Sequence, residues 1–386
     1  MNRRHFVSFA STLASACAAL GTQAAFAATP LKVAVLIPQS GPASLFGPSA
    51  KACAELAVEQ LNARGGILGR KVEILFGDSG LPPAEAAQTA LKLWKGSKAE
   101  AVIGMHDSAV RGALTALFKG QVPYFYTPVY EGGECSAATF MNGETPSQQL
   151  EPVIPWLTAE RKIKKWYLIG NDYIWGRNTN GAAKGYITKA GAQVVGDEYV
   201  AFSVDNFDSS LARIRDSGAD AVLVSLVGGS SVTFNKAFAG FGLADKAVRL
   251  GSLIEENTLA GIGVENAKNL YASMGYFASL TTPDAVAFAQ AYAKRFGPKA
   301  AMLNGLAESV YEGFLMLEAM ATKAGDLSAA KLERASEGAS YKGPRGTVTM
   351  HARHVDQDIF VADVTPQGFR PVKTFAHVPS GQSCKV

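Results

Sequence analysis

The 386-residue chain has the composition of a globular protein, with 48% hydrophobic and 18% charged residues, and its length suits two domains of ordinary size. The formal net charge is +4, but setting aside Arg3 and Arg4 of the first 27 residues, which hold no acid, leaves 35 basic against 33 acidic residues. Because the numbers of basic and acidic residues are nearly equal, the net charge gives no argument for binding to nucleic acid or to an anionic membrane surface.

Residues 1–27 have the layout of an export signal. A basic start with Arg3 and Arg4 leads through an apolar middle to Ala25-Phe26-Ala27, which predicts cleavage before Ala28. The paired arginines also fit the twin-arginine pattern, so general secretory and twin-arginine export both stay open. No other segment is long and apolar enough to span a bilayer. We therefore expect an exported, periplasmic protein.

Three cysteines remain after the export signal. Cys53, Cys135 and Cys384 make an odd number in an oxidising compartment, so one disulfide with one free thiol, or no disulfide, are both open. Cys53 falls in an apolar helical stripe, which predicts a core position.

From Leu31 onward, strand and helix patterns alternate with short polar connections. The periodicity predicts strands over 31–37, 72–76, 101–104 and 123–127, and helices over 48–61, 84–94 and 108–118. Pro38 ends the first strand, and Gly65-Gly66 ends the first helix. Such alternation predicts a parallel sheet covered by helices on both faces.

The same pattern restarts after a proline-rich loop. Strands are expected over 165–170, 193–200, 220–226, 248–253 and 267–276, and helices over 177–190, 208–217, 231–241, 283–296 and 303–324. Three short antiparallel strands, 346–350, 358–364 and 369–375, end the chain. We therefore predict an α/β fold of two similar doubly wound lobes joined by a hinge. Residues 28–148 with 280–343 form the first lobe, and 149–279 with 344–386 the second.

In open parallel sheets, ligands bind beyond the carboxyl ends of the strands. The loops at those ends are rich in Ser, Thr, Tyr, Asp and Glu, which suits a small polar solute, and they hold no Lys or Arg cluster, which argues against a phosphate or polyanion. They cover residues 39–46, 105–108, 126–134, 171–175, 227–231, 253–257 and 276–282.

The common enzyme motifs are missing. The sequence has no Walker A loop and no Gly-x-Gly-x-x-Gly fingerprint, and Gly228-Gly229-Ser230-Ser231-Val232 lacks the final glycine of a nucleophile elbow. His351-Ala352-Arg353-His354 lacks the glutamate and third ligand of a metal hydrolase. We therefore expect a binding protein rather than an enzyme, with no catalytic residues, no metal and no cofactor.

Several separated motifs resemble the extracytoplasmic solute-binding proteins of ABC transporters for branched-chain amino acids, amides and urea. The motifs are Val33 to Pro42, Asn62 to Arg70, the loop ending at Ser108, and Tyr130-Glu131-Gly132, within a likeness that runs from about Leu31 to Phe375. Residues 126–132, 171–175 and 276–283 are most similar to the amide- and urea-binding branch. The resemblance implies a type I periplasmic binding fold.

The resemblance also implies a function. Such a protein, a Venus-flytrap monomer, closes its lobes on an amide, urea or amino-acid solute and delivers it to ABC transporter permease subunits at the membrane. A ligand sensor of the amide-regulator type, signalling to a partner protein, stays open as the alternative.

Within the family, the serine that Ser108 matches holds the ligand's carboxylate or carbonyl. The resemblance further implies that Tyr126 and Thr127 donate hydrogen bonds, that Tyr173 closes over the ligand from the second lobe, and that Glu255 meets an ammonium or amide nitrogen.

Two residues depart from the family pattern. His106 stands where amide-binding relatives have a tyrosine, and Asp107 beside it also differs, which favours a more cationic or more strongly hydrogen-bonding solute. Phe46 is expected as a lid contact. Simpler roles stay open: Ser108 as a helix N-cap, Tyr126 and Tyr173 as packing residues, Phe46 as loop packing, and Glu255 with Glu256 as a solvated pair at a helix start.

Overall fold

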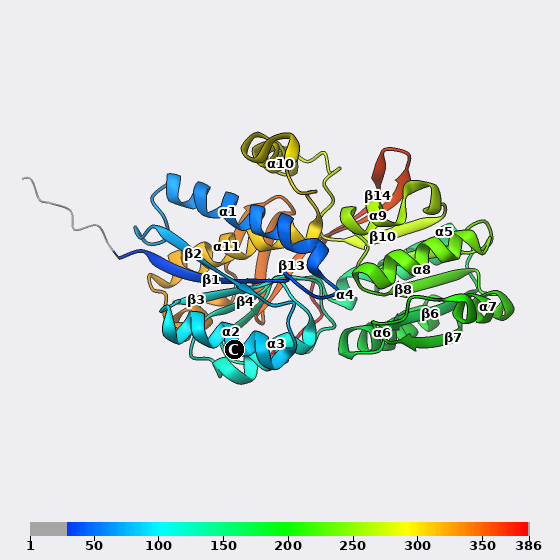
Figure 1. Cartoon of the computed structure of the whole chain (residues 1–386), viewed down its shortest axis with the longest axis horizontal. Helices are drawn as coiled ribbons and strands as arrows, with labels where there is room; N and C mark the ends of the chain where they lie inside the picture. Colours follow the sequence, from blue (N-terminus) through cyan, green and yellow to red (C-terminus); the bar gives the residue numbers. More distant parts are fainter. Residues whose placement is uncertain (1–28, 385–386) are drawn as a thin grey trace, which may run out of the picture.

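The computed structural model describes residues 29–384, and the protein consists of two lobes lying side by side (Figure 1). The predicted export signal falls outside the described residues. Within residues 29–384, no helix has the length and apolar character needed to cross a membrane.

The first lobe is built on parallel strands in the order β2–β1–β3–β4–β5. They are β1 (Leu31–Ile37), β2 (Val72–Asp78), β3 (Ala101–Gly104), β4 (Tyr124–Tyr126) and β5 (Thr139–Met141). Because side chains alternate between faces, Val33 and Val35 pack toward α1 (Gly47–Ala63) and α11 (Gly305–Ala324). Ala34 and Leu36 pack toward α2 (Pro83–Leu91) and α3 (Ser108–Phe118) on the opposite face.

The second lobe repeats this plan with parallel strands in the order β7–β6–β8–β9–β10. They are β6 (Lys165–Asn171), β7 (Gln193–Val200), β8 (Ala221–Ser225), β9 (Val248–Gly251) and β10 (Leu270–Met274). One face packs on α5 (Val153–Glu160) and α6 (Ile174–Lys189), and the other on α7 (Asp208–Ser217), α8 (Gly228–Gly240) and α9 (Glu256–Ile262). The predicted fold of two doubly wound lobes is confirmed.

Further short elements and one longer helix lie outside these two layered sheets. They are α4 (Pro146–Gln149), α10 (Pro283–Phe296), α12 (Ala329–Ser336), the strands β11 (Ser340–Gly343) and β12 (Gly346–His351), and the short turns η1 (Ser44–Phe46), η2 (Lys92–Gly96), η3 (Val264–Asn266) and η4 (Gly297–Lys299). The predicted strand and helix positions agree within a few residues, whereas the strands β5 and β11 and the helices α4, α5, α9 and α12 were not predicted. A segment of three to eight residues shows too little of its period to be recognised.

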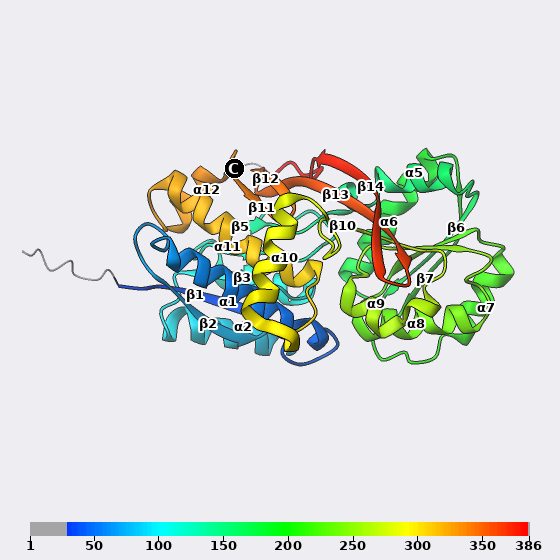
Figure 2. The ribbon, with the colours of Figure 1, turned by 90° about the horizontal axis from the view of Figure 1, so that it is seen from above.

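Two long strands close the chain, as Figure 2 shows. The start of β13 (His354–Thr365) pairs with β5 and β12 of the first lobe, and its end pairs with β10 of the second and with β14 (Gly368–Val378). The chain therefore makes its last crossing between the lobes within β13. Since β12 still pairs with β11, this crossing lies later than residue 344, where the sequence places it.

The chain crosses between the lobes three times, after β5, after β10 and within β13, and a buried ionic group, the hinge cluster, lies at these crossings. It consists of Glu144, Glu308, Glu312, Arg345 and Gln357, all at most 2% exposed. Arg345 contacts Glu308 (2.7 Å), Glu312 (3.3 Å), Glu144 (3.4 Å) and Gln357 (2.8 Å). The Glu144 carboxylate also accepts a hydrogen bond from the Gly275 backbone on the second crossing. Two of the three crossings therefore contact the Arg345 guanidinium directly, through Glu144 and Gln357, and the third is bonded to Glu144.

Cys135 and Cys384 form a disulfide, and Cys53 is a buried free thiol. Of the two possibilities left open by the sequence, the structure shows one pair and one free cysteine. The disulfide ties the loop after β4 to the C-terminal segment. The buried Cys53 lies in the core as predicted, and burial raises the pKa of its thiol.

Candidate functional site

A cavity lies between the two lobes, at the carboxyl ends of their parallel strands. It encloses about 50 Å³. The first lobe contributes Pro38, Ala43, Phe46, Met105, His106, Asp107, Ser108, Tyr126, Pro128, Val129 and Leu306, and the second contributes Tyr173, Trp175, Val227 and Leu253. Aromatic and aliphatic side chains make most of the wall, and among the described residues no lysine or arginine lines it. Five of the seven predicted site residues, Phe46, His106, Ser108, Tyr126 and Tyr173, therefore meet at one cavity.

Ser108 opens helix α3, but it is not the cap. Asp107 is the N-cap, since its carboxylate accepts hydrogen bonds from the backbone N–H groups of Ala109 (2.8 Å) and Val110 (2.9 Å). The Ser108 hydroxyl is thereby released from the helix and donates to the Glu131 carboxylate at 2.6 Å. The simpler N-cap role left open for Ser108 is wrong.

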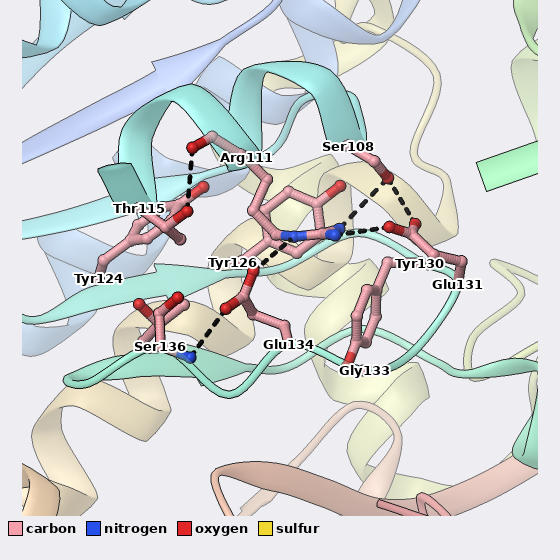
Figure 3. A network of polar contacts seen from close by, with 12 residues as sticks. Ser108, Arg111, Thr115, Tyr124, Tyr126, Tyr130, Glu131, Gly133, Glu134 and Ser136 are labelled. Carbon is pink, nitrogen blue, oxygen red and sulfur yellow. Dashed lines mark hydrogen bonds and ion pairs between the residues drawn. The ribbon is translucent and has the colours of Figure 1, made fainter. Parts of the chain in front are cut away.

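Behind Ser108 lies a network centred on Arg111, one helical turn later (Figure 3). Arg111 donates to Ser108 at 3.2 Å, to Glu131 at 2.5 Å and to Glu134 at 3.2 Å. Its guanidinium also packs over the Tyr126 and Tyr130 rings, 5.1 and 4.8 Å from their centroids. Burial tends to raise the pKa of Glu134, but hydrogen bonds from Ser136 and the Arg111 charge outweigh it and lower that pKa.

His106 lines the cavity while both its ring nitrogens are occupied elsewhere. Nε2 pairs with the Tyr124 hydroxyl at 2.9 Å, and Nδ1 lies 3.0 Å from the Asp107 carbonyl. Burial lowers the pKa of His106 to about 4, so the ring is neutral at pH 7. The ring folds back over Gly104, where an added Cβ would lie 2.5 Å from Nε2. This departure from the family pattern is therefore packed into the first lobe.

Tyr126 lines the same wall and donates its hydroxyl proton to the His106 carbonyl at 2.7 Å. Its pKa is raised by burial, so the phenol stays protonated at neutral pH. The hydroxyl can therefore accept a further hydrogen bond but has no second proton to give.

Tyr173 and Trp175 form the facing wall from the second lobe. Tyr173 is the N-cap residue of α6, and the two rings pack at a centroid distance of 6.1 Å. Within residues 29–384, neither the Tyr173 hydroxyl nor the Trp175 indole N–H donates a hydrogen bond, so both donors are uncommitted. Burial raises the pKa of Tyr173, which keeps its proton at neutral pH.

Thr127 and Glu255 do not line the cavity. Thr127 is fully buried and bonds to Ser309 and to the Gly104 carbonyl inside the first lobe. Glu255 is the N-cap of α9, where its carboxylate accepts from Asn257 and Thr258. Burial raises the pKa of Glu255. Both residues therefore position backbone near the site, and Glu255 is a buried cap, not half of a solvated pair.

Three features of the site were not predicted as such: Trp175 in the wall, and Arg111 and Glu131 behind it. Trp175 fell inside a loop expected at the cleft. The spacing of Ser108 and Arg111 could have indicated one helix face. Among the described residues, no group of three or more His, Cys, Asp or Glu could hold a metal ion.

The family model for periplasmic binding proteins matches residues 30–369 of this chain. A Leu/Ile/Val-binding protein homolog 6 from Brucella melitensis is 27% identical over 360 residues, covering 89% of this chain and 90% of the relative.

Solved structures share the fold. A solute-binding protein of an ABC transporter from Rhodopseudomonas palustris, in complex with p-hydroxybenzoic acid, has a TM-score of 0.83 at 23% identity, covering 92% of this chain and 98% of that one. A branched-chain amino acid transporter substrate-binding protein from Streptococcus pneumoniae, in complex with isoleucine, has a TM-score of 0.78 at 20% identity, covering 91% and 100%. These relatives are binding proteins, not enzymes. With most of its length matched, the chain belongs to the periplasmic binding protein family.

Proposed function

We propose that this protein is the extracytoplasmic solute receptor of an ABC importer, binding a small polar solute of the amide, urea or amino-acid type between its lobes. The observation that carries the proposal is the cavity at the strand ends, whose wall comes from both lobes. Ligands of open α/β sheets bind at such ends. The relatives' names support the transport role, since they are binding proteins for Leu/Ile/Val or components of ABC transporters.

The size of the cavity favours a small solute. Its volume of about 50 Å³ gives room for roughly three to five water-sized groups in this conformation. A short amide or urea has about that size. The aliphatic and aromatic wall suits a small alkyl group beside the polar one.

Entry requires that the lobes separate, because the solute would contact walls on both sides. A solute that bridges Ser108 and Tyr126 on one lobe and Tyr173 on the other binds the closed form better than the open one. Its binding would therefore shift the population toward closure. The hinge for this motion would be the three crossings joined at the hinge cluster, and Phe46 would close one end of the cavity.

The test is isothermal titration of the purified protein, freed of co-purified solute by dialysis from denaturant and refolding, with acetamide, propionamide, urea, leucine and acetate. We expect a hit among the amides, urea or the amino acid, accompanied by a decrease in radius of gyration in small-angle X-ray scattering. A solute present at 100 times its Kd would add about 2.7 kcal/mol to stability, visible as a higher Tm. If none of these compounds binds, the proposed ligand class is wrong.

The partner is expected to be permease subunits at the membrane. Affinity capture from membranes of the source cells, with the hit compound present, should retain permease subunits. Retention of a sensor protein instead would favour the signalling alternative.

A further inference from the structure

The hydroxyl protons of Ser108 and Tyr126 in the first-lobe wall are already committed. Ser108 gives its hydroxyl proton to Glu131 and accepts from Arg111, and Tyr126 gives its proton to the His106 carbonyl. A hydroxyl carries one proton and two lone pairs. Toward the cavity, these two hydroxyls can therefore only accept hydrogen bonds.

Two features that would attract an anion at this wall, the capped N–H groups of α3 and the Arg111 guanidinium, are occupied by the chain's own carboxylates. Asp107 accepts hydrogen bonds from the N–H groups of Ala109 and Val110, and Glu131 accepts from both Ser108 and Arg111. Glu134 accepts a hydrogen bond from the Nε of Arg111. The Arg111 and Glu131 side chains are only 6% and 1% exposed, so neither turns out to solvent. Two carboxylates contact one guanidinium here, and the Asp107 carboxylate caps the same helix, which disfavours a further negative charge.

The second-lobe wall has the opposite character. Tyr173 and Trp175 both line the cavity, and within the described residues neither the Tyr173 hydroxyl nor the Trp175 indole N–H donates a hydrogen bond. An acceptor group of a solute would find its donors there. A solute that gives hydrogen bonds at one end and accepts at the other matches both walls.

We propose that Glu131 is the specificity-determining residue of the cavity: by accepting the Ser108 hydroxyl proton, it makes that hydroxyl a hydrogen-bond acceptor that selects an N–H donor, such as a primary amide, over a carboxylate. The inference rests on the proposed function, because it concerns the solute bound in the same cavity. It assigns Ser108 the reverse of the role expected from the resemblance, which was to hold a carboxylate or carbonyl.

Glu131→Gln should reverse the direction of the hydrogen bond between residue 131 and the Ser108 hydroxyl. Arg111 needs an acceptor at the position of Oε1, so the amide oxygen lies there and the NH₂ group faces Ser108. The NH₂ group then donates to Ser108 and frees the hydroxyl proton for the solute. The variant should therefore accept a carboxylate where the wild-type protein rejects one.

The matched control is Glu134→Gln. It also removes one negative charge beside Arg111, but the Ser108 hydroxyl still donates its hydrogen bond to the Glu131 carboxylate at 2.6 Å. Comparing the two variants separates the hydrogen-bond direction at Ser108 from the charge of the network.

The experiment measures, by isothermal titration at pH 7.5, the Kd values of two shape-matched pairs: acetamide with acetate, and propionamide with propionate. We expect the wild-type protein to prefer each amide by about tenfold or more, since a carboxylate would leave its charge unpaired at an acceptor wall. E131Q should lower that preference about tenfold, and E134Q should keep it. Circular dichroism checks that each variant folds.

The outcomes are distinguishable. Wild-type binding of the carboxylates as tight as that of the amides overturns the inference and leaves the receptor function standing, and this result needs no variant. An unchanged preference in E131Q, or an equal loss of preference in E134Q, overturns the role of Glu131. If E131Q does not fold, Ser108→Ala replaces it, and it should weaken the amides while leaving the carboxylates unchanged. Absence of binding by all four compounds overturns the inference, and the proposed ligand class is then also wrong if urea and leucine do not bind.

Discussion

Replacing Arg345 with methionine removes the cation from the hinge cluster and leaves Glu144, Glu308 and Glu312 buried without it. Arg345 is 1% exposed on its side chain, and its Nε lies 2.7 Å from Glu308, so little solvent screens the pair. Removing one partner of a buried ion pair typically costs about 3 to 5 kcal/mol, because the remaining charge stays desolvated. We expect a loss of that size in the free energy of unfolding at pH 8.

The loss should shrink as the pH falls. Burial raises the pKa of Glu308 well above its ordinary 4.5, while the Arg345 charge partly offsets this. A carboxyl whose folded pKa is raised stabilises the fold fully below its unfolded pKa and loses that contribution as pH rises through the folded pKa. Without Arg345 the pKa rises further. Between pH 8 and pH 6, each extra proton kept by the folded variant recovers up to about 2.7 kcal/mol.

The assay is urea unfolding of the solute-free protein, followed by tryptophan fluorescence at pH 8, 7 and 6. Arg370→Met is the matched control, since Arg370 pairs with Asp363 on the surface and its side chain is 62% exposed. The control should leave the unfolding midpoint unchanged. A loss below about 1 kcal/mol for R345M at pH 8, or a loss that grows toward pH 6, would refute the reasoning.

Three further changes test the site and its frame. Tyr173→Phe removes an uncommitted donor and should weaken binding of the hit solute by about three- to tenfold in isothermal titration, whereas unchanged affinity would place that hydroxyl outside the bound shell. Joint replacement of Cys135 and Cys384 by serine should lower the free energy of unfolding by about 2 to 4 kcal/mol in urea, and an unaltered midpoint would contradict this. Gly104→Ala should cost about 1 to 3 kcal/mol, measured by thermal unfolding, because the new Cβ would meet His106; an equal Tm would show that the ring can move at no cost.

Much of the frame follows from local patterns. The alternation of Val33 and Val35 with Ala34 and Leu36 is enough to predict a strand covered on both faces, and the loops at the strand ends then follow from topology. That reasoning brought Phe46, Ser108, Tyr126 and Tyr173 to one cavity.

The features that could not be predicted are the partner of each hydrogen bond and the residue that caps each helix. Asp107 and Ser108 are both good N-cap residues, and only the backbone geometry shows that Asp107 takes the position. Glu255 lies in the second lobe, where the resemblance implies a carboxylate that meets the ligand, yet its side chain caps helix α9. A sequence shows which groups can hydrogen bond, but their partners are set by packing.

The role of Ser108 in particular is decided by contacts far along the chain. Glu131 reaches Ser108 from a loop that also contains Gly133 and Cys135, whose partners lie in the C-terminal segment: Gln382 accepts from the Gly133 backbone at 2.8 Å, and Cys384 forms the disulfide. Groups that are fixed before the ligand arrives need no ordering on binding, so the direction of their hydrogen bonds discriminates between solutes. A relative that shares the serine but holds its loop differently can present a donor at the same place. The family therefore constrains the fold, while under our proposal the carboxylate behind the serine selects the solute.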